Sequence, residues 1–261
     1  MGEKNDRANN KTDEIKKFDY EKITRDGRKK GVEFVAVEES YDLIVNGMRI
    51  SSIMASPNDL KELIYGYLVS EGIVKSKDQI SSVEVKDNKL YAFIEGSEKI
   101  EQWLELRSSG CVGVHWGDSE EEVSIESEFK IGSDLIFKAL EHLNTNLYKK
   151  TSGSHSASLI DEQGKILAKS VDVGRHNAFD KVIGKGLLKG IDMSRTILLA
   201  SGRQSAGMVM KAARAGIPII VSKAAPLSSG IEAAKRTNLT LICFADEKKF
   251  SVFTGGQNIE N

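Results

Sequence analysis

The feature that most constrains the fold is the alternation of short apolar runs with helical segments in the second half of the chain. Three runs have the length and β-branched content of buried strands, at Thr196–Ala200, Ile217–Ser222 and Thr240–Ala245. Helical segments over Gly207–Ala215 and Gly230–Thr237 separate them. Strands and helices that alternate in this way form a largely parallel sheet covered on both faces, so the sequence predicts an α/β unit here.

The residues before this alternation extend the same unit. Ala157–Asp161 and Ile166–Val171 predict a hairpin, with Gly164 in its turn. Asn177–Leu188 has the spacing of a helix, and Ile131–Tyr148 has that of an amphipathic helix. We therefore expect one α/β domain from residue 129 onward.

A smaller α+β domain is expected before it. Asn46-Gly47 predicts the turn of a hairpin between two apolar strands. A helix should follow the Ser-Pro-Asn-Asp segment that ends at Asp59, and Gly72 should end it. Two further strands are predicted at Ser82–Lys86 and Lys89–Ile94, separated by Asp-Asn.

The remaining segments are polar. The first residues cannot bury enough apolar surface to offset the loss of chain entropy, so we expect them to be disordered. Between the two domains lie a cysteine-containing loop and a run with six acidic residues in eleven, at Asp118–Glu128, which is typical of a solvated surface. The expected organisation is a disordered tail at 1–30, an α+β domain at 31–105, a mobile cysteine loop with an acidic linker at 106–128, and an α/β domain at 129–261.

Composition excludes several classes of protein. With a net charge of -1, the chain has no overall electrostatic attraction to nucleic acid or to a membrane surface. It shows neither the apolar run of a signal peptide nor a run long enough to span a membrane. We therefore expect a cytoplasmic protein that binds neither nucleic acid nor membrane, and a structural disulfide is not expected there.

The two cysteines have different surroundings. Cys111 lies in R-S-S-G-C-V-G-V-H-W, where the flanking glycines let the backbone approach another molecule closely. A thiolate is the reactive form of cysteine, and Arg107 and His115 could lower the thiol pKa. The alternative is that Cys111 is a small buried hydrophobic residue. Cys243 lies in the apolar run Leu-Ile-Cys-Phe and is expected in the core.

The segment V-D-V-G-R-H-N-A, between a predicted strand and a predicted helix, has the densest group of polar side chains. Asp172 or Asn177 could cap the helix, whose N-terminus would then favour an anion. Arg175 supplies a planar cation for phosphate or carboxylate, and His176 could donate, accept or shuttle a proton. Alternatively, Asp172 and Arg175 simply form an ion pair.

Other small-residue loops follow predicted strands in the same way. Ser201–Gly207 contains Arg203, and Ser222–Ser229 contains Lys223. Ligands of open α/β sheets bind at the carboxyl ends of the strands. The sequence therefore predicts a pocket for a large anionic ligand, lined by Arg175, His176, Asn177, Arg203 and Lys223.

Metal ligands are not expected. The four histidines are scattered, and the spacings Cys-x-x-Cys and His-x-x-x-His are absent from the sequence. A zinc deaminase needs His-x-Glu with Pro-Cys-x-x-Cys. Ser156 and Ala157 follow His155 here, and neither cysteine follows a proline, so we reject a zinc site.

Several of these segments together resemble the FdhD family, the formate dehydrogenase accessory sulfurtransferases. The resemblance extends from Tyr41 to Thr254, and its most specific part is D-V-G-R-H-N-A-F-D-K, which ends at Lys181. The other matching segments are Leu68–Ile73, Ser201–Arg203, Lys211–Pro218 and Ser222–Pro226.

The resemblance implies a function and a fold. Members of the family take persulfide sulfur from a cysteine desulfurase and pass it to the molybdenum or tungsten bis(molybdopterin guanine dinucleotide) cofactor of formate dehydrogenase. It also implies a homodimer whose C-terminal α/β domain is similar to the cytidine deaminase fold without the zinc. The persulfide cysteine falls on Cys111. The cofactor-binding stretch falls on Phe244, Ala245, Asp246, Glu247, Lys248 and Lys249.

Two departures from the family pattern bear on function. Many members have Cys-x-x-Cys in the loop where this chain has Val114 as the fourth residue, so a relay between two cysteines of one loop is not possible here. Asp246 and Glu247 occupy a stretch that is often basic. Two other functions stay open. One is a chaperone that holds the cofactor without sulfur passing through Cys111, and the other is a nucleotide-processing enzyme with a deaminase-like fold.

Overall fold

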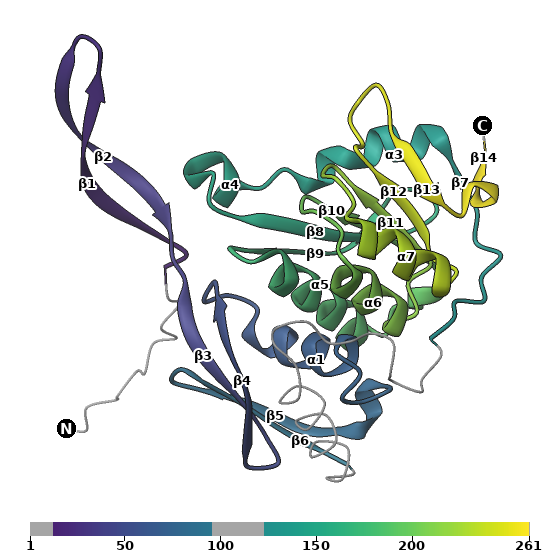
Figure 1. The fold of residues 1–261 in the computed structure, drawn as a ribbon. Coiled ribbons are helices and arrows are strands. Elements are labelled where there is room, and N and C mark those ends of the chain that lie inside the picture. The colour runs from purple at the N-terminus through teal and green to yellow at the C-terminus, as the bar shows by residue number, and fades with distance from the viewer. Residues whose placement is uncertain (1–12, 96–122, 261) are drawn as a thin grey trace, which may run out of the picture.

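The computed structural model describes residues 13–95 and 123–260, and it is built in layers (Figure 1). A six-stranded sheet in the C-terminal half has helices on both faces. Helix α1 (Leu60–Ser70) packs between the helices of one face and a four-stranded sheet of the N-terminal half. Mixed α/β architecture is therefore confirmed.

The six-stranded sheet has the strand order β13-β12-β11-β10-β8-β9. Its three central strands are parallel, as the alternation of strands and helices predicts, whereas β8, β9 and β13 pair antiparallel with their neighbours. The two edge strands, β9 and β13, are antiparallel to their neighbours because a short connection joins each of them to the adjacent strand. The strands are β8 (His155–Ile160), β9 (Ile166–Asp172), β10 (Ile197–Ala200), β11 (Ile219–Ser222), β12 (Thr240–Cys243) and β13 (Ser251–Thr254).

Alternate residues of the central strands bury opposite faces of this sheet, as the period of a strand requires. Leu198 faces a core formed with α5 (Arg175–Lys189), α6 (Ala206–Arg214) and α7 (Ser228–Arg236). Leu199 faces a second core on the other side, formed with the segment that contains α3. Both faces are thus buried, which explains why these strands are apolar at every position except Ser222 and Thr240 at their ends.

The segment predicted as one helix over Ile131–Tyr148 is instead divided, and that prediction was wrong. Asn144 has extended backbone angles, and the hydroxyl of Thr145 accepts a hydrogen bond from Tyr148 N at 3.1 Å, which starts a new helix. The pieces are β7 (Ile131–Gly132), α3 (Ser133–Ala139), the 3-10 helix η2 (Leu140–Leu143) and α4 (Asn146–Thr151). β7 pairs with β14 (Ile259–Glu260).

The four-stranded sheet has the order β4-β3-β6-β5. The predicted turn is confirmed, because Asn46 and Gly47 both have positive φ (48° and 84°), the geometry of a type I′ hairpin. The inner face packs on Leu63, Ile64 and Leu68 of α1. The strands are β3 (Glu39–Val45), β4 (Met48–Ala55), β5 (Ile80–Lys86) and β6 (Lys89–Ile94), and further 3-10 helices are η1 (Lys77–Gln79), η3 (Met193–Arg195) and η4 (Gly256–Asn258).

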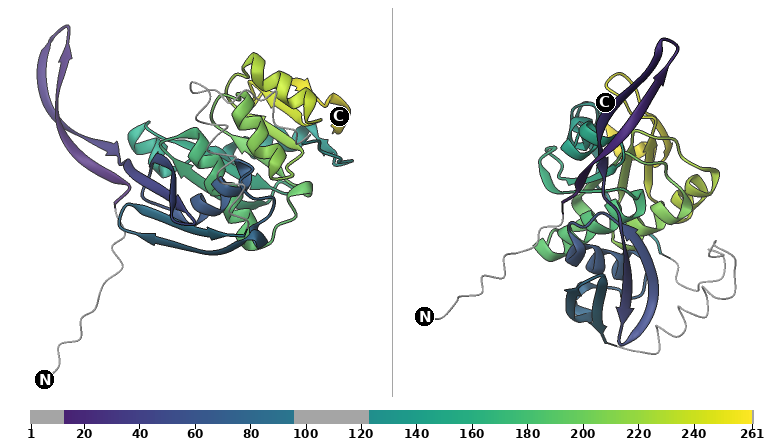
Figure 2. Two further views of the ribbon diagram at one scale, coloured as in Figure 1. Left: turned by 60° about the horizontal axis from the view of Figure 1, so that its bottom comes forward. Right: turned by 90° about the vertical axis from the view of Figure 1, so that its left-hand side faces the viewer.

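Part of the segment expected to be disordered is a β-ribbon. β1 (Ile15–Thr24) and β2 (Gly27–Ala36) pair over their whole length and project from the body (Figure 2). Most of their side chains are exposed, so the expectation that this segment buries little was correct and the inference of disorder over 13–30 was wrong. Ladder hydrogen bonds and local ring contacts, such as the Tyr20 ring over Gly31, order the ribbon without a core. Residues 1–12 lie outside the described part.

The two halves of the molecule meet where α1 crosses α5. A Cβ atom on Gly66 would lie 1.7 Å from the carbonyl oxygen of Asp180, and one on Gly184 would lie 1.9 Å from that of Glu62. Backbone therefore contacts backbone in both directions. Only glycine lets two helices approach so closely.

We expect Gly184→Ala to lower the free energy of unfolding by about 3 kcal/mol, because the new methyl group would overlap a carbonyl that cannot move without its helix. Gly132→Ala is the matched control, since a Cβ there meets no atom within 4 Å. Chemical denaturation of both variants checks this. A Gly184→Ala protein as stable as the control would show that the helices are not in backbone contact.

Candidate functional site

The loops at one edge of the six-stranded sheet form a continuous surface. β8 runs antiparallel to β10, so its first residue lies at the same edge as the last residues of β10. Ser201 N donates to Ser156 O at 3.1 Å, and Lys223 N donates to Ala200 O at 3.0 Å. Phe244 N in turn donates to Ala224 O at 3.1 Å. The loops after β10, β11 and β12 are thus joined by their own backbones.

Arg175 lies at this edge beside the first loop. A Cβ on Gly202 would lie 2.9 Å from Cβ of Arg175 and 3.4 Å from Nδ1 of His155, so the absence of a side chain at Gly202 lets both residues approach. Nε of Arg175 is buried and has no hydrogen-bond partner among the described residues. The aliphatic part of Arg175 therefore packs against Gly202, and its guanidinium keeps a buried donor without a described partner.

His155 belongs to the same group, although the sequence analysis did not include it in the pocket. Its Nδ1 lies 3.3 Å from Ser201 Oγ, which also accepts a hydrogen bond from Ser156 N at 3.0 Å. Burial lowers the pKa of His155, and the positive charge of Arg175 lowers it further. The ring is therefore neutral near pH 7. The only signal in the sequence was the small-residue segment that precedes this strand.

Arg203 and Lys223 are exposed, each in a loop that follows a parallel strand. Gln204, next to Arg203, is fully buried instead. Its Nε2 donates to Gly202 O at 2.7 Å, while its Oε1 has no partner within the described part of the chain. Arg175, Arg203 and Lys223 thus lie next to strand ends at the same edge of the sheet, and Gln204 adds a buried amide oxygen without a described partner.

The stretch from Phe244 to Lys249 forms nearly all of the loop between β12 and β13. Phe244 is 47% exposed and has a φ of 53°, a left-handed conformation that is rare for a bulky residue and is typical of functional sites. Oδ1 of Asp246 accepts hydrogen bonds from the backbone N–H groups of Lys248 and Lys249 at 2.7 and 2.9 Å, which lower the Asp246 pKa. Asp246 therefore holds the turn. Ala245 is buried, whereas Glu247, Lys248 and Lys249 are exposed.

Asn177 faces the interior of the molecule. Its Nδ2 donates to Met54 O at 2.7 Å and to Asp172 Oδ1 at 3.0 Å. Asp172 Oδ2 accepts from Lys181 Nζ at 2.6 Å, and both side chains of this ion pair are completely buried. The alternative in which Asp172 pairs with Arg175 was wrong, and so was the predicted cap, because Gly174 is the N-cap residue of α5 and no side chain caps it.

His176 lies beside a second buried polar group. Lys211 Nζ contacts Asp180 Oδ1 and Glu71 Oε1, both at 2.7 Å, and donates to Ser70 Oγ at 3.0 Å. Burial alone would lower the pKa of Lys211, but the two carboxylates overcome this effect and raise it. Burial, together with the positive charges of Lys211 and Arg175, lowers the pKa of His176 to about 4. His176 is thus a neutral residue next to the junction of the two halves.

Cys243 lies in the core, as predicted. It is completely buried in β12, and burial raises the pKa of its thiol to about 12. Cys111, with Arg107 and His115 around it, lies outside the described residues.

No group of three or more histidine, cysteine, aspartate or glutamate side chains among the described residues is placed to hold a metal ion. No described helix is long and apolar enough to cross a membrane.

Comparison with known proteins decides the family. The model of the FdhD/NarQ family matches residues 36–260. The chain belongs to this family. The motif from Asp172 to Lys181 lies within the match, whereas β1 and nearly all of β2 precede it.

Two individual relatives match the sequence of this chain over most of their length. The chain is 36% identical to the sulfur carrier protein FdhD of Methanothermobacter thermautotrophicus, over 90% of this chain and 94% of the relative. It is 35% identical to the sulfur carrier protein FdhD of Wolinella succinogenes, over 87% of this chain and 82% of the relative.

A solved structure shares the fold. The crystal structure of a proposed formate dehydrogenase accessory protein from Desulfotalea psychrophila matches with a TM-score of 0.78 and 26% sequence identity. The match covers 94% of this chain and 99% of that chain. A protein of known crystal structure therefore has the fold described above.

The lowered pKa of His176 predicts a pH dependence of stability. Below pH 6.5 the imidazole becomes protonated in the unfolded chain, but in the folded protein it stays neutral down to about pH 4. The unfolded state therefore gains protons first, and stability falls as the pH decreases through this range. We expect His176→Gln to reduce this fall by up to about 3 kcal/mol between pH 7 and 4, measured by denaturation at each pH. Parallel pH profiles for the two proteins would contradict it.

Proposed function

We propose that this protein is a sulfur carrier in the maturation of formate dehydrogenase. It takes persulfide sulfur from a cysteine desulfurase and passes it to the molybdenum or tungsten bis(molybdopterin guanine dinucleotide) cofactor. Membership of the FdhD/NarQ family supports this role, as do relatives named as sulfur carriers and the accessory protein that shares the fold.

One observation supports Cys111 as the residue that carries the sulfur. The chain has two cysteines, and Cys243 is buried with a pKa of about 12, so it supplies neither access nor thiolate. The thiolate of Cys111 attacks the outer sulfur of the desulfurase persulfide. A bond forms between that sulfur and Cys111 Sγ, the S–S bond of the donor breaks, and the donor cysteine leaves as a thiolate. The proton stays on the transferred sulfur, and the step involves no net oxidation or reduction.

The edge with Arg175, Arg203 and Lys223 would hold the cofactor as cargo. The guanine dinucleotide ends carry phosphates, which bind to guanidinium and ammonium groups and to backbone N–H groups of small-residue loops. The free Nε of Arg175 and the free Oε1 of Gln204 fit a ligand with both acceptors and donors. The exposed ring of Phe244 offers a surface on which a base can stack. Lys248 and Lys249 extend the positive charge.

The finer features implied by the family belong to the same proposal. We infer a cytidine-deaminase-like fold without zinc for the C-terminal domain, supported by its parallel strands β10, β11 and β12 covered on both faces. A homodimer that acts in the cytoplasm and contacts both a desulfurase and formate dehydrogenase completes the proposal.

A chaperone that holds the cofactor without carrying sulfur is the second candidate. Val114 stands where many members have a second cysteine, and this observation favours it. The two functions share the edge with the three cations and differ only at Cys111.

Intact-protein mass spectrometry after incubation with a cysteine desulfurase and cysteine separates the two. We expect the wild type and Cys243→Ala to gain the mass of one sulfur atom, reversed by a reductant, and Cys111→Ser to gain nothing. The reason is that only a thiolate open to a partner attacks a persulfide. No gain in the wild type while the desulfurase is active would favour the chaperone.

Binding of GDP, as a probe for one guanine dinucleotide end, tests the cofactor edge. We expect Arg175→Met and Arg203→Met each to weaken binding roughly tenfold, because each removes a charge-assisted hydrogen bond to phosphate. Lys235→Met, an exposed change on α7, is the control and should bind as the wild type does. Unchanged affinity in both arginine variants, measured by isothermal titration calorimetry, would exclude this edge.

A further inference from the structure

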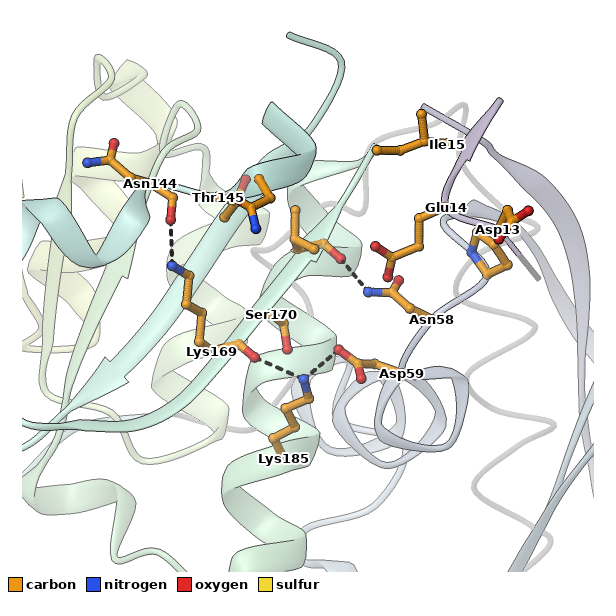
Figure 3. Close-up of a pocket in the computed structure, with 13 residues that line it drawn as sticks. Asp13, Glu14, Ile15, Asn58, Asp59, Asn144, Thr145, Lys169, Ser170 and Lys185 are labelled. Carbon is orange, nitrogen blue, oxygen red and sulfur yellow. Dashed lines mark hydrogen bonds and ion pairs between the residues drawn. The ribbon is translucent and has the colours of Figure 1, made fainter. Parts of the chain in front are cut away.

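A cavity of about 1080 Å³ opens between the base of the ribbon, the N-terminus of α1, the start of α4 and the strand β9 (Figure 3). Arg175, Arg203 and Lys223, which we propose bind the cofactor, lie outside it. It is lined mostly by polar and charged side chains. Its volume is slightly above the usual range of small-ligand sites, which is about 300–1,000 Å³.

A buried hydroxyl group lies in the wall of this cavity. Ser170, on β9, is 3% exposed, and its Oγ has no hydrogen-bond partner among the described residues. Buried hydroxyl groups are nearly always paired, because an unpaired one loses its hydrogen bonds to water without replacement. Because Oγ is itself covered, it can pair with a molecule in the cavity only after the side chain or the wall shifts toward it.

Two lysines line the cavity, and only one of them is paired with a carboxylate of the described residues. Lys185 is neutralised by Asp59, whose Oδ2 lies 2.5 Å from its Nζ. Lys169 Nζ donates only to the carbonyl of Asn144, at 2.7 Å, and forms no ion pair with a described carboxylate. Its pKa is lowered by burial and by the charge of Lys149. Lys169 thus presents a partly desolvated ammonium group that needs an anion.

The opposite charge lies across the cavity. Glu14, at the base of the ribbon, extends its carboxylate into the cavity from the side opposite Lys169 (Figure 3). It forms no ion pair within residues 13–95 and 123–260. The two groups do not neutralise each other, so a molecule with an anion at one end and a cation at the other would satisfy both.

The backbone of β9 supplies further hydrogen-bonding groups to the cavity. β9 is an edge strand, and the outward carbonyls of Lys169 and Val171 accept hydrogen bonds from Lys185 and Asn58. In an antiparallel strand, the N–H of a residue points to the same side as its carbonyl. Two peptide N–H groups therefore point outward along the edge of the cavity. Such groups recognise the main chain of an extended peptide.

We propose that this cavity binds a short linear peptide with free ammonium and carboxylate termini. Its carboxylate meets Lys169, its ammonium group meets Glu14, and its amide groups reach Ser170 and the edge of β9. The volume exceeds what a single amino acid fills. The site is independent of the sulfur-carrier function.

Isothermal titration calorimetry with triglycine tests the proposal. We expect saturable binding to the wild type, and binding roughly tenfold weaker to Lys169→Met and to Glu14→Gln, because each loses one charged contact. Ser170→Ala should weaken binding less. Lys150→Met, an exposed change on α4 outside the cavity lining, is the control and should bind as the wild type does.

A second peptide keeps the test independent of whether the variants fold. N-acetyltriglycinamide has the same backbone without charged ends, and we expect it to bind the wild type at least tenfold more weakly. Equal affinity for the two peptides would overturn the proposal, as would no saturable binding of triglycine. Unchanged binding in both Lys169→Met and Glu14→Gln would do the same.

Discussion

The contact between the backbones of α1 and α5 is the constraint on which the rest of the structure depends. Because Gly66 and Gly184 have no side chains, Ser70 of α1 comes within hydrogen-bond distance of Asp180 and of Lys211. The buried pair of Asp172 with Lys181 lies along the same junction and binds the backbone of Ser56. Removing one partner of such a pair costs about 3–5 kcal/mol, because it leaves an unpaired buried charge at the junction.

The junction of the two halves gives the motif from Asp172 to Lys181 both a structural role and a proposed role in binding. Within D-V-G-R-H-N-A-F-D-K, the side chains of Asp172, Asn177, Asp180 and Lys181 all bind groups of the N-terminal half or of α6. Arg175 alone among these polar residues lies beside Gly202 at the open edge of the sheet. The helix that joins the two halves therefore also fixes the position of a cation at the proposed cofactor site.

Sequence patterns predicted the elements well, but not which way their residues face. Buried parallel strands, the Asn46-Gly47 turn and the core position of Cys243 follow from periodicity and turn chemistry. Convergence of Arg203 and Lys223 follows because carboxyl ends of parallel strands share one edge. The inward orientation of Asn177 depends on α1, which comes from a distant part of the chain. The break at Asn144 and the ribbon depend on a local cap and a ladder that apolar spacing does not reveal.

The ribbon formed by β1 and β2 has a further consequence. Its hydrogen bonds are local, and its exposed large side chains, among them Phe18 and Ile23, contribute nothing to the three cores of the body. Beyond its base, where Ala36 lies beside Gly153, the ribbon resembles an isolated hairpin, which is marginally stable in water. We therefore expect the outer part of the ribbon to open at a lower free energy than the body does. The chain thus combines a body whose halves are joined at glycine contacts with an arm that is held mainly by its own ladder.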